Sequence, residues 1–239
     1  MVAKDMSMRG AAMQLQYLYL CPICLTIAAV FIVVEKAKSY LVADVIKGVA
    51  SCFFVILGVL GAFGSSDPVL ARYVVAGLVL GAVADVLLNL RYVYEGSKGQ
   101  LAFLAGILVF LAGHVAYIVA CLPYASQPVI AFVLGAVLAA VLLYWIFGRI
   151  EAKIAFKVFG VFYIGIITVL NCLALVVLVG NPTAHWAVFL CGTLLFLASD
   201  VILILNTFGS KQSFLMRIAN LMLYYVGQLL IALSLQLPL

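Results

Sequence analysis

The chain has 239 residues, of which 68% are hydrophobic and only 9% are charged. Soluble domains contain about 45–50% apolar and about 25% charged residues, so this composition excludes an ordinary soluble fold, and its low polarity excludes a disordered chain. The net charge of +5 is too sparse to form a nucleic-acid-binding stripe. Because backbone groups in lipid must be hydrogen-bonded internally and the apolar runs are long and unbroken, we predict an all-α, polytopic membrane protein.

Eight apolar runs follow one another along the chain, each of roughly 18–25 residues, enough to cross a hydrocarbon core of about 30 Å as a helix. We place these transmembrane helices at residues 17–34, 41–63, 71–90, 101–121, 128–147, 155–179, 185–206 and 217–237. The first run is long for the core of a signal peptide and lacks a small-x-small cleavage site, so an uncleaved helix is predicted. Short connections join the runs, which predicts one membrane domain over residues 17–239 after an N-terminal tail of residues 1–16.

Basic residues are unevenly distributed between the two sides of the predicted bundle. Nine lie in or next to the loops after the first, third, fifth and seventh helices: Lys36, Lys38, Arg91, Lys98, Arg149, Lys153, Lys157, Lys211 and Arg217. Three lie on the opposite side: Lys4, Arg9 and Arg72. Because cytoplasmic loops are enriched in Lys and Arg, the odd-numbered loops are predicted to face the cytoplasm and both termini the other side. We expect a multi-pass protein of the cell membrane in a bacterium, or of the endoplasmic reticulum in a eukaryote.

Six cysteines are scattered along the predicted helices, and two of them form the sequence Cys21-Pro-Ile-Cys24. This spacing also occurs in redox motifs, but no thioredoxin-like context surrounds it. We therefore interpret the cysteines as small buried apolar residues.

Four ionisable residues inside the predicted helices stand out: Lys47, Asp85, His114 and Asp200. A charged side chain there costs at least about 2.5–3.5 kcal/mol, so such residues usually face the bundle interior and mark function. At the helical rise, the lysine and both aspartates lie about 7–9 Å from their predicted cytoplasmic ends and Tyr224 about 10 Å, whereas the histidine is deeper, about 20 Å into its helix. The first four are therefore predicted to converge. Polar companions in these helices are Asn89, Tyr117, Tyr163, Asn171, Asn206, Tyr224, Tyr225 and Gln228.

The segments around the two aspartates resemble each other. A glycine lies eight residues before each acid, at Gly77 and Gly192, and a small residue precedes and a valine follows each aspartate. The two helices run in the same direction, four helices apart. This similarity predicts a parallel 4+4 repeat, with both acids near a pseudo-twofold axis along the membrane normal.

Several classes of site lack their characteristic residues. With only two histidines, the chain cannot form a three-His zinc centre. It has no Gly-x-Ser-x-Gly, P-loop or dinucleotide-binding glycine motif. The aspartates follow Ala84 and Ser199, not the Tyr and Gly expected in intramembrane aspartyl proteases.

The remaining polar residues allow more than one interpretation. Two close carboxyl groups, one protonated and one ionised, suit hydrolysis through an oxocarbenium-like transition state, and the same pair could relay protons in a transporter. Structural interpretations are a neutralising pair of Lys47 with Asp85, and hydrogen-bonding roles for His114 and the asparagines. The two adjacent tyrosines, 224 and 225, could also belong to an aromatic belt.

Four linked segments resemble the TMEM86/YhhN family, the lysoplasmalogenases. They are Gly81-Ala-Val-Ala-Asp85-Val-Leu-Leu, Gly113-His114-Val-Ala-Tyr117, Phe196-Leu-Ala-Ser-Asp200-Val-Ile-Leu-Ile-Leu-Asn-Thr-Phe208 and Tyr224-Tyr225-Val-Gly-Gln228-Leu-Leu-Ile-Ala-Leu-Ser234. Lys47 matches a lysine in the family's second span. The chain departs from the family at Ala84, where members often have Gly, and at Gly48, where they have Pro.

This resemblance implies an eight-helix membrane hydrolase that cleaves the vinyl ether of lysoplasmalogens, with a lysophospholipid as substrate and neither metal nor cofactor required. Asp85 and Asp200 match the family's acidic positions. We expect one to protonate the vinyl β-carbon and the other to stabilise the cation and activate water. Supporting roles are expected for Lys47, which would bind phosphate or keep an aspartate ionised, and for Asn89, His114, Tyr117, Tyr163, Tyr224, Tyr225 and Gln228. The alternative from another class is a proton-coupled transporter or lipid-binding membrane protein.

Overall fold

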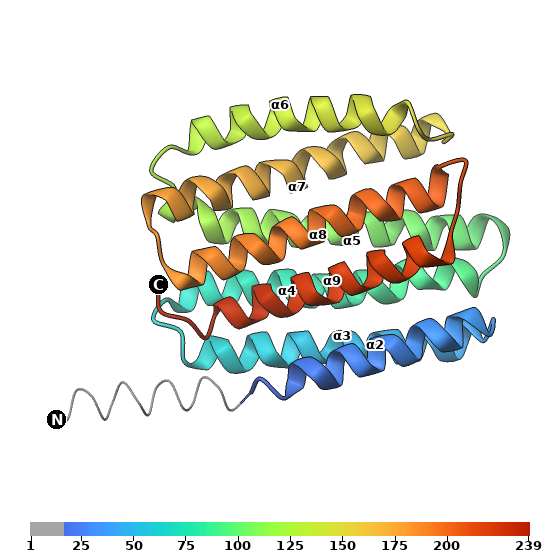
Figure 1. Ribbon diagram of the computed structural model, residues 1–239, viewed down its shortest axis with the longest axis horizontal. Helices are drawn as coiled ribbons and strands as arrows, with labels where there is room; N and C mark the ends of the chain where they lie inside the picture. Colours follow the sequence, from blue (N-terminus) through green and yellow to red (C-terminus); the bar gives the residue numbers. More distant parts are fainter. Residues whose placement is uncertain (1–16) are drawn as a thin grey trace.

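The computed structural model describes residues 17–239, in which eight α-helices run up and down side by side in one bundle (Figure 1). The helices are α2 (Leu20–Lys36), α3 (Tyr40–Phe63), α4 (Pro68–Asn89), α5 (Gly96–Cys121), α6 (Pro128–Phe147), α7 (Ile154–Gly180), α8 (Ala184–Phe208) and α9 (Phe214–Ser234). Two short 3₁₀ turns, η1 (Leu90–Tyr92) and η2 (Leu122–Tyr124), follow α4 and α5. The odd-numbered loops of the sequence prediction lie together at the right-hand end of Figure 1.

The helices from α3 to α9 are long and apolar enough to cross a membrane, with mean hydropathies between 1.4 and 2.7. The all-α, polytopic fold is therefore confirmed, and each predicted run matches an observed helix to within five residues at either end. Helix α2 has 17 residues, so the eighth span stays a prediction. The predicted N-terminal tail lies outside the described residues.

Polar residues before the helices fix where several of them begin. The Asp67 side chain accepts hydrogen bonds from the backbone N–H groups of Val69 and Leu70, at 2.8 and 3.0 Å, which caps the first turn of α4. The hydroxyl of Tyr124 also donates to Asp67, and these hydrogen bonds lower the pKa of its carboxyl. Ser213 caps α9 in the same way by accepting from the N–H of Met216.

The two halves of the bundle pack in corresponding ways, in agreement with the predicted 4+4 repeat. Helix α4 approaches α5 so closely that a Cβ on Gly113 would lie 3.3 Å from the carbonyl oxygen of Gly77. Helix α8 approaches α9 likewise, since a Cβ on Gly227 would lie 2.8 Å from the carbonyl oxygen of Gly192. Helix α3 contacts α9 just as α7 contacts α5. The glycines found by sequence comparison are thus the points of close helix approach.

Burial differs between the two faces of each helix. Helix α6 lies at one edge of the bundle beside α7, and most of its apolar side chains are exposed, as lipid-facing residues are (Figure 1). All six cysteines are free thiols, but Cys52 and Cys191 are exposed. The prediction that every cysteine is buried is therefore wrong for these two, because they lie on the outer faces of α3 and α8.

Candidate active site

The carboxyl group of Asp85 in α4 is surrounded by donors from two other helices. The Lys47 ammonium in α3 lies 3.0 Å from Oδ1 and also donates to the main-chain carbonyl of Asp85 at 3.1 Å. The hydroxyls of Ser51 and Tyr224 both donate to Oδ2, at 2.6 and 2.7 Å. Asp85 is only 2% exposed. A cation and two hydroxyl donors together stabilise a carboxylate ion in this buried place.

A second layer of side chains holds these donors in position. The Gln228 amide donates to the Tyr224 hydroxyl at 3.3 Å and accepts from the Tyr117 hydroxyl at 3.1 Å. The Tyr225 hydroxyl donates to the main-chain carbonyl of Lys47 at 3.3 Å. Tyr117, Tyr225 and Gln228 therefore act on the carboxylate through other residues. Both adjacent tyrosines are buried, so the aromatic-belt interpretation is wrong.

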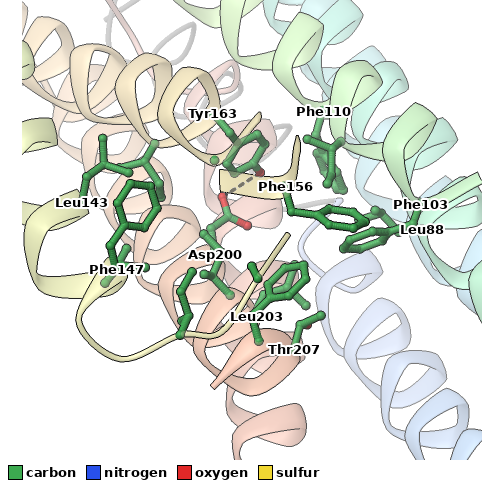
Figure 2. A pocket seen from close by; sticks show the side chains of 18 residues that line it. Leu88, Phe103, Phe110, Leu143, Phe147, Phe156, Tyr163, Asp200, Leu203 and Thr207 are labelled. Atoms are coloured by element: carbon green, nitrogen blue, oxygen red, sulfur yellow. Dashed lines mark hydrogen bonds between the residues drawn. The ribbon is translucent and has the colours of Figure 1, made fainter. Parts of the chain in front are cut away.

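The carboxyl group of Asp200 in α8 has simpler surroundings. It accepts one hydrogen bond, from the Tyr163 hydroxyl of α7 at 2.9 Å, and within residues 17–239 no cation pairs with it (Figure 2). The ring of His114 lies 5.3 Å from that of Tyr163, centroid to centroid. Its Nδ1 is 2.9 Å from the carbonyl oxygen of Phe110, and its Nε2 has no partner among the described residues. His114 thus packs behind Tyr163 instead of contacting either carboxyl group.

An apolar pocket of about 60 Å³ lies beside Asp200 (Figure 2). Side chains of α5, α6, α7 and α8 form its wall: Phe103, Ile107, Phe110, Leu143, Ile146, Phe147, Phe156, Gly160, Ile164, Leu203, Ile204 and Phe208. Asp200, Tyr163 and Thr207 are the polar residues in this wall. The carboxyl group therefore borders a space otherwise suited to hydrocarbon.

A polar pocket of about 30 Å³ adjoins the apolar pocket. Its polar lining consists of Lys47, Asp85, Asn89, Arg91, Ser199, Asp200, Arg217, Asn220 and Tyr224. The two pockets share Asp200 and four apolar residues, Leu88, Phe103, Phe110 and Leu203. The two aspartates, predicted to lie at one depth, thus line the same pocket.

A vestibule of about 590 Å³ lies next to the polar pocket, at the bundle end that carries the odd-numbered loops. Its polar lining consists of Glu35, Lys36, Tyr40, Arg91, Tyr92, Asn206, Thr207, Gln212, Ser213 and Arg217. It shares Arg91, Leu203 and Arg217 with the polar pocket. The pocket that holds the two aspartates therefore adjoins an open space at this end of the bundle.

Sequence analysis overlooked several residues of the site. Ser51 and Asp44 are one helical turn from Lys47 in α3, so their spacing of four and three could have revealed them. Asp44 is 5% exposed, and its Oδ1 has no partner among the described residues. Arg217, predicted at the loop end of the last helix as a residue that sets orientation, lies inside α9 and forms a two-point ion pair with Glu35, at 2.7 and 3.0 Å. No local pattern could reveal that pair, because 182 residues separate its members.

Other sequence-predicted residues fall at the margin of the site or outside it. Asn89 lines the polar pocket, where its Oδ1 is 3.5 Å from an Arg217 nitrogen. Asn206 accepts from the Ser213 N–H at the vestibule. Asn171 donates to its own helix at Ile167 and lines a separate apolar groove. Within residues 17–239, no three His, Cys, Asp or Glu side chains converge as ligands to a metal ion would.

Comparison with known proteins gives one match. The sequence profile of the YhhN family matches residues 42–235, which contain both aspartates, Lys47 and the supporting tyrosines. Searches of curated proteins and of solved structures gave no significant match.

Proposed function

Since this chain belongs to the YhhN family, we propose that it is a membrane-embedded lysoplasmalogenase, which hydrolyses the vinyl-ether bond of a lysoplasmalogen. The products are a fatty aldehyde and glycerophosphoethanolamine or glycerophosphocholine. The observation that carries the proposal is the position of Asp200, at the junction between the apolar pocket and the polar pocket that holds the Lys47–Asp85 pair. In a single-chain ether lipid the reactive vinyl-ether bond likewise lies between a hydrocarbon chain and a polar head group, so the chain would occupy the apolar pocket and the head group the polar side.

We propose different roles for the two carboxyl groups because their surroundings differ. Asp85, with Lys47 and two hydroxyl donors, acts as the carboxylate ion. Asp200, with one neutral donor and an apolar wall, acts as the protonated general acid. In this proposal Lys47 keeps Asp85 ionised, which is one of the two roles expected for it.

The proposed reaction has four proton transfers. Each aspartate gives one proton to the substrate and takes one proton from water or from the intermediate. Asp200 gives its proton to the vinyl β-carbon, and the positive charge of the resulting oxocarbenium ion is stabilised by the Asp85 carboxylate. Water adds to the cationic carbon and gives a proton to Asp85, which forms a hemiacetal. As the hemiacetal C–O bond breaks, Asp85 returns its proton to the departing glycerol oxygen and Asp200 takes the hydroxyl proton. Aldehyde and alcohol leave, and both carboxyl groups regain their starting states.

Purified protein in neutral detergent, incubated with 1-alkenyl-lysophosphatidylethanolamine, tests the proposal. We expect release of aldehyde and glycerophosphoethanolamine in equal amounts. In D₂O, the aldehyde, trapped at once by borohydride reduction, should carry one deuterium at its second carbon, because the proton added there comes from the acid. An ester lysolipid of the same chain length, which lacks the vinyl carbon, is the matched control.

Two results would contradict this function. Turnover that survives both Asp85→Asn and Asp200→Asn would remove the acid–base pair from the reaction. Absence of turnover on any vinyl-ether or ester lysolipid, together with proton-dependent flux into liposomes, would identify a transporter instead.

A further inference from the structure

We propose that Arg91 binds the phosphate of a lysophospholipid where the vestibule meets the polar pocket. The inference rests on the proposed function for the identity of the substrate, but binding of the phosphate can be tested separately. Arg91 lies in η1 at the end of α4 and lines both spaces.

The guanidinium of Arg91 is fixed in orientation by two aromatic rings. Its central carbon lies 4.5 Å from the centroid of the Phe103 ring and 4.6 Å from that of Tyr92. Nη2 donates to the Tyr92 hydroxyl at 2.6 Å. A guanidinium has five N–H donors, so this arrangement orders the group and leaves other donors for a ligand.

Arg91 differs from Lys47 and Arg217 in having no anionic partner among the described residues. Lys47 is paired with Asp85, and Arg217 is paired with Glu35. In the part of the chain that the structure describes, no carboxylate lies within ion-pairing distance of Arg91. Three cations and one carboxylate line the vestibule, so this half-buried wall has a surplus of positive charge that an anionic ligand would balance.

The order of the pockets selects the type of anion. With a hydrocarbon chain beside Phe147 and Phe156, and the first ether oxygen near Asp200, the remaining glycerol carbons lead through the polar pocket toward Arg91. A phosphodiester on the last glycerol carbon then reaches the guanidinium fork, whose geometry suits phosphate. A fatty acid would instead place its carboxylate between the two aspartates, where Asp85 repels it.

Direct binding in neutral detergent tests this assignment without relying on catalysis. The ligands are lysophosphatidylethanolamine and a monoacylglycerol with the same acyl chain, which differ in the phosphate head group. We expect Arg91→Ala to weaken lysophosphatidylethanolamine binding at least ten-fold and to leave monoacylglycerol binding unchanged. Arg91→Lys, which keeps the charge but loses the fork, should give an intermediate loss and shows whether an effect of the alanine variant is due to misfolding.

Arg149→Ala is the matched control. Arg149 also stacks on an aromatic ring, that of Trp145 at 4.1 Å, and lies at the same end of the bundle, but it lines none of the three spaces of the site. Its removal should change neither affinity. Equal losses for both ligands on Arg91→Ala, or no loss for either, would overturn the proposal.

Two further measurements are needed. One shows whether the bound phosphate belongs to the substrate, to free phosphate or to a bilayer lipid, and the other separates the phosphate-site proposal from the hydrolase proposal. Inorganic phosphate and diacyl phosphatidylglycerol are tested as competitors, and each should displace lysophosphatidylethanolamine poorly. Strong, Arg91-dependent competition by the diacyl lipid would assign the site to bilayer head groups and overturn its role in substrate binding. Absence of aldehyde release with Arg91-dependent lysolipid binding intact would contradict the hydrolase function alone.

Discussion

Asp85 and Asp200 occupy corresponding helices of the two halves, yet their surroundings differ. Tyr224 lies three residues before Gly227 in α9, and Phe110 lies three residues before Gly113 in α5, so the two are equivalent in the repeat. Tyr224 donates a hydrogen bond to Asp85, whereas a phenylalanine has no hydroxyl to offer Asp200. The lysine is likewise present on one side only. Corresponding helices thus place one carboxyl group beside a cation and two hydroxyl donors, and the other beside one hydroxyl and an apolar wall.

Substitution of each aspartate by asparagine gives the largest expected effects and tests whether the two sites differ. Each variant should lose about 10²–10⁴-fold in kcat, because an amide neither donates nor accepts the required proton. Stability should separate them. Asp85→Asn leaves Lys47 buried without its counter-ion, at a cost of about 3–5 kcal/mol, whereas Asp200→Asn removes no ion pair. Thermal unfolding in detergent measures the difference, and equal losses of Tm would contradict the assignment of charges.

Removal of the tyrosine hydroxyls gives a smaller contrast between the same two sites. A hydrogen bond to a charged group is worth about 1.5–3 kcal/mol and one between neutral groups about 0.5–1.5 kcal/mol. Tyr224→Phe should therefore lower kcat by about 10- to 150-fold, and Tyr163→Phe by about 2- to 10-fold. Steady-state kinetics on one vinyl-ether substrate gives both values. A larger loss at Tyr163 would reverse the roles of the two aspartates.

Filling the apolar pocket with a larger side chain tests whether this pocket, next to Asp200, binds the hydrocarbon chain of the lipid. A Cβ on Gly160 of α7 would meet no atom within 4 Å, so Gly160→Leu would project into the pocket. If two methylenes of a long chain are displaced, at about 0.8 kcal/mol each, KM should rise by about 15-fold for that chain and change little for a short one. Gly165→Leu is the matched control, because Gly165 also has open space around it but does not line the pocket. The same KM change for every chain length would place the hydrocarbon elsewhere.

The smallest effect is expected at the bundle end opposite the vestibule. Asp67→Ala removes the cap of α4 and should cost about 0.5–2 kcal/mol of stability while leaving kcat unchanged. Because hydrogen bonds lower the pKa of Asp67 in the folded protein, its contribution is complete above about pH 4 and is lost as pH falls through the folded pKa. Thermal unfolding from pH 7 to pH 3 should therefore bring the wild type toward the variant. A loss of activity in the variant at neutral pH would show that this end is coupled to the site.

Much of the site could be predicted from the sequence because lipid makes polar residues conspicuous. Each charged side chain inside an apolar run needs an interior position, and helical rise then places it at a depth. This reasoning found Lys47, Asp85, Asp200 and Tyr224. It missed Asp44, which lies close to the predicted start of its helix, and Ser51, which carries no charge, although both are one turn from Lys47.

What the sequence by itself determined is the all-helical membrane fold, the helix boundaries to within a few residues and the repeat centred on two aspartates. These follow from the amino-acid composition, from the lengths of the apolar runs and from the repeated spacing of residues around the aspartates, all of which are local properties of the sequence. The tertiary structure decided which donor reaches which carboxyl group, that Arg217 is neutralised by Glu35, and that Arg91 is left without a carboxylate partner among the described residues. It also placed Asp200 at the junction of two pockets. Such relations depend on helix rotation and on contacts between residues far apart in the chain, which no local pattern encodes.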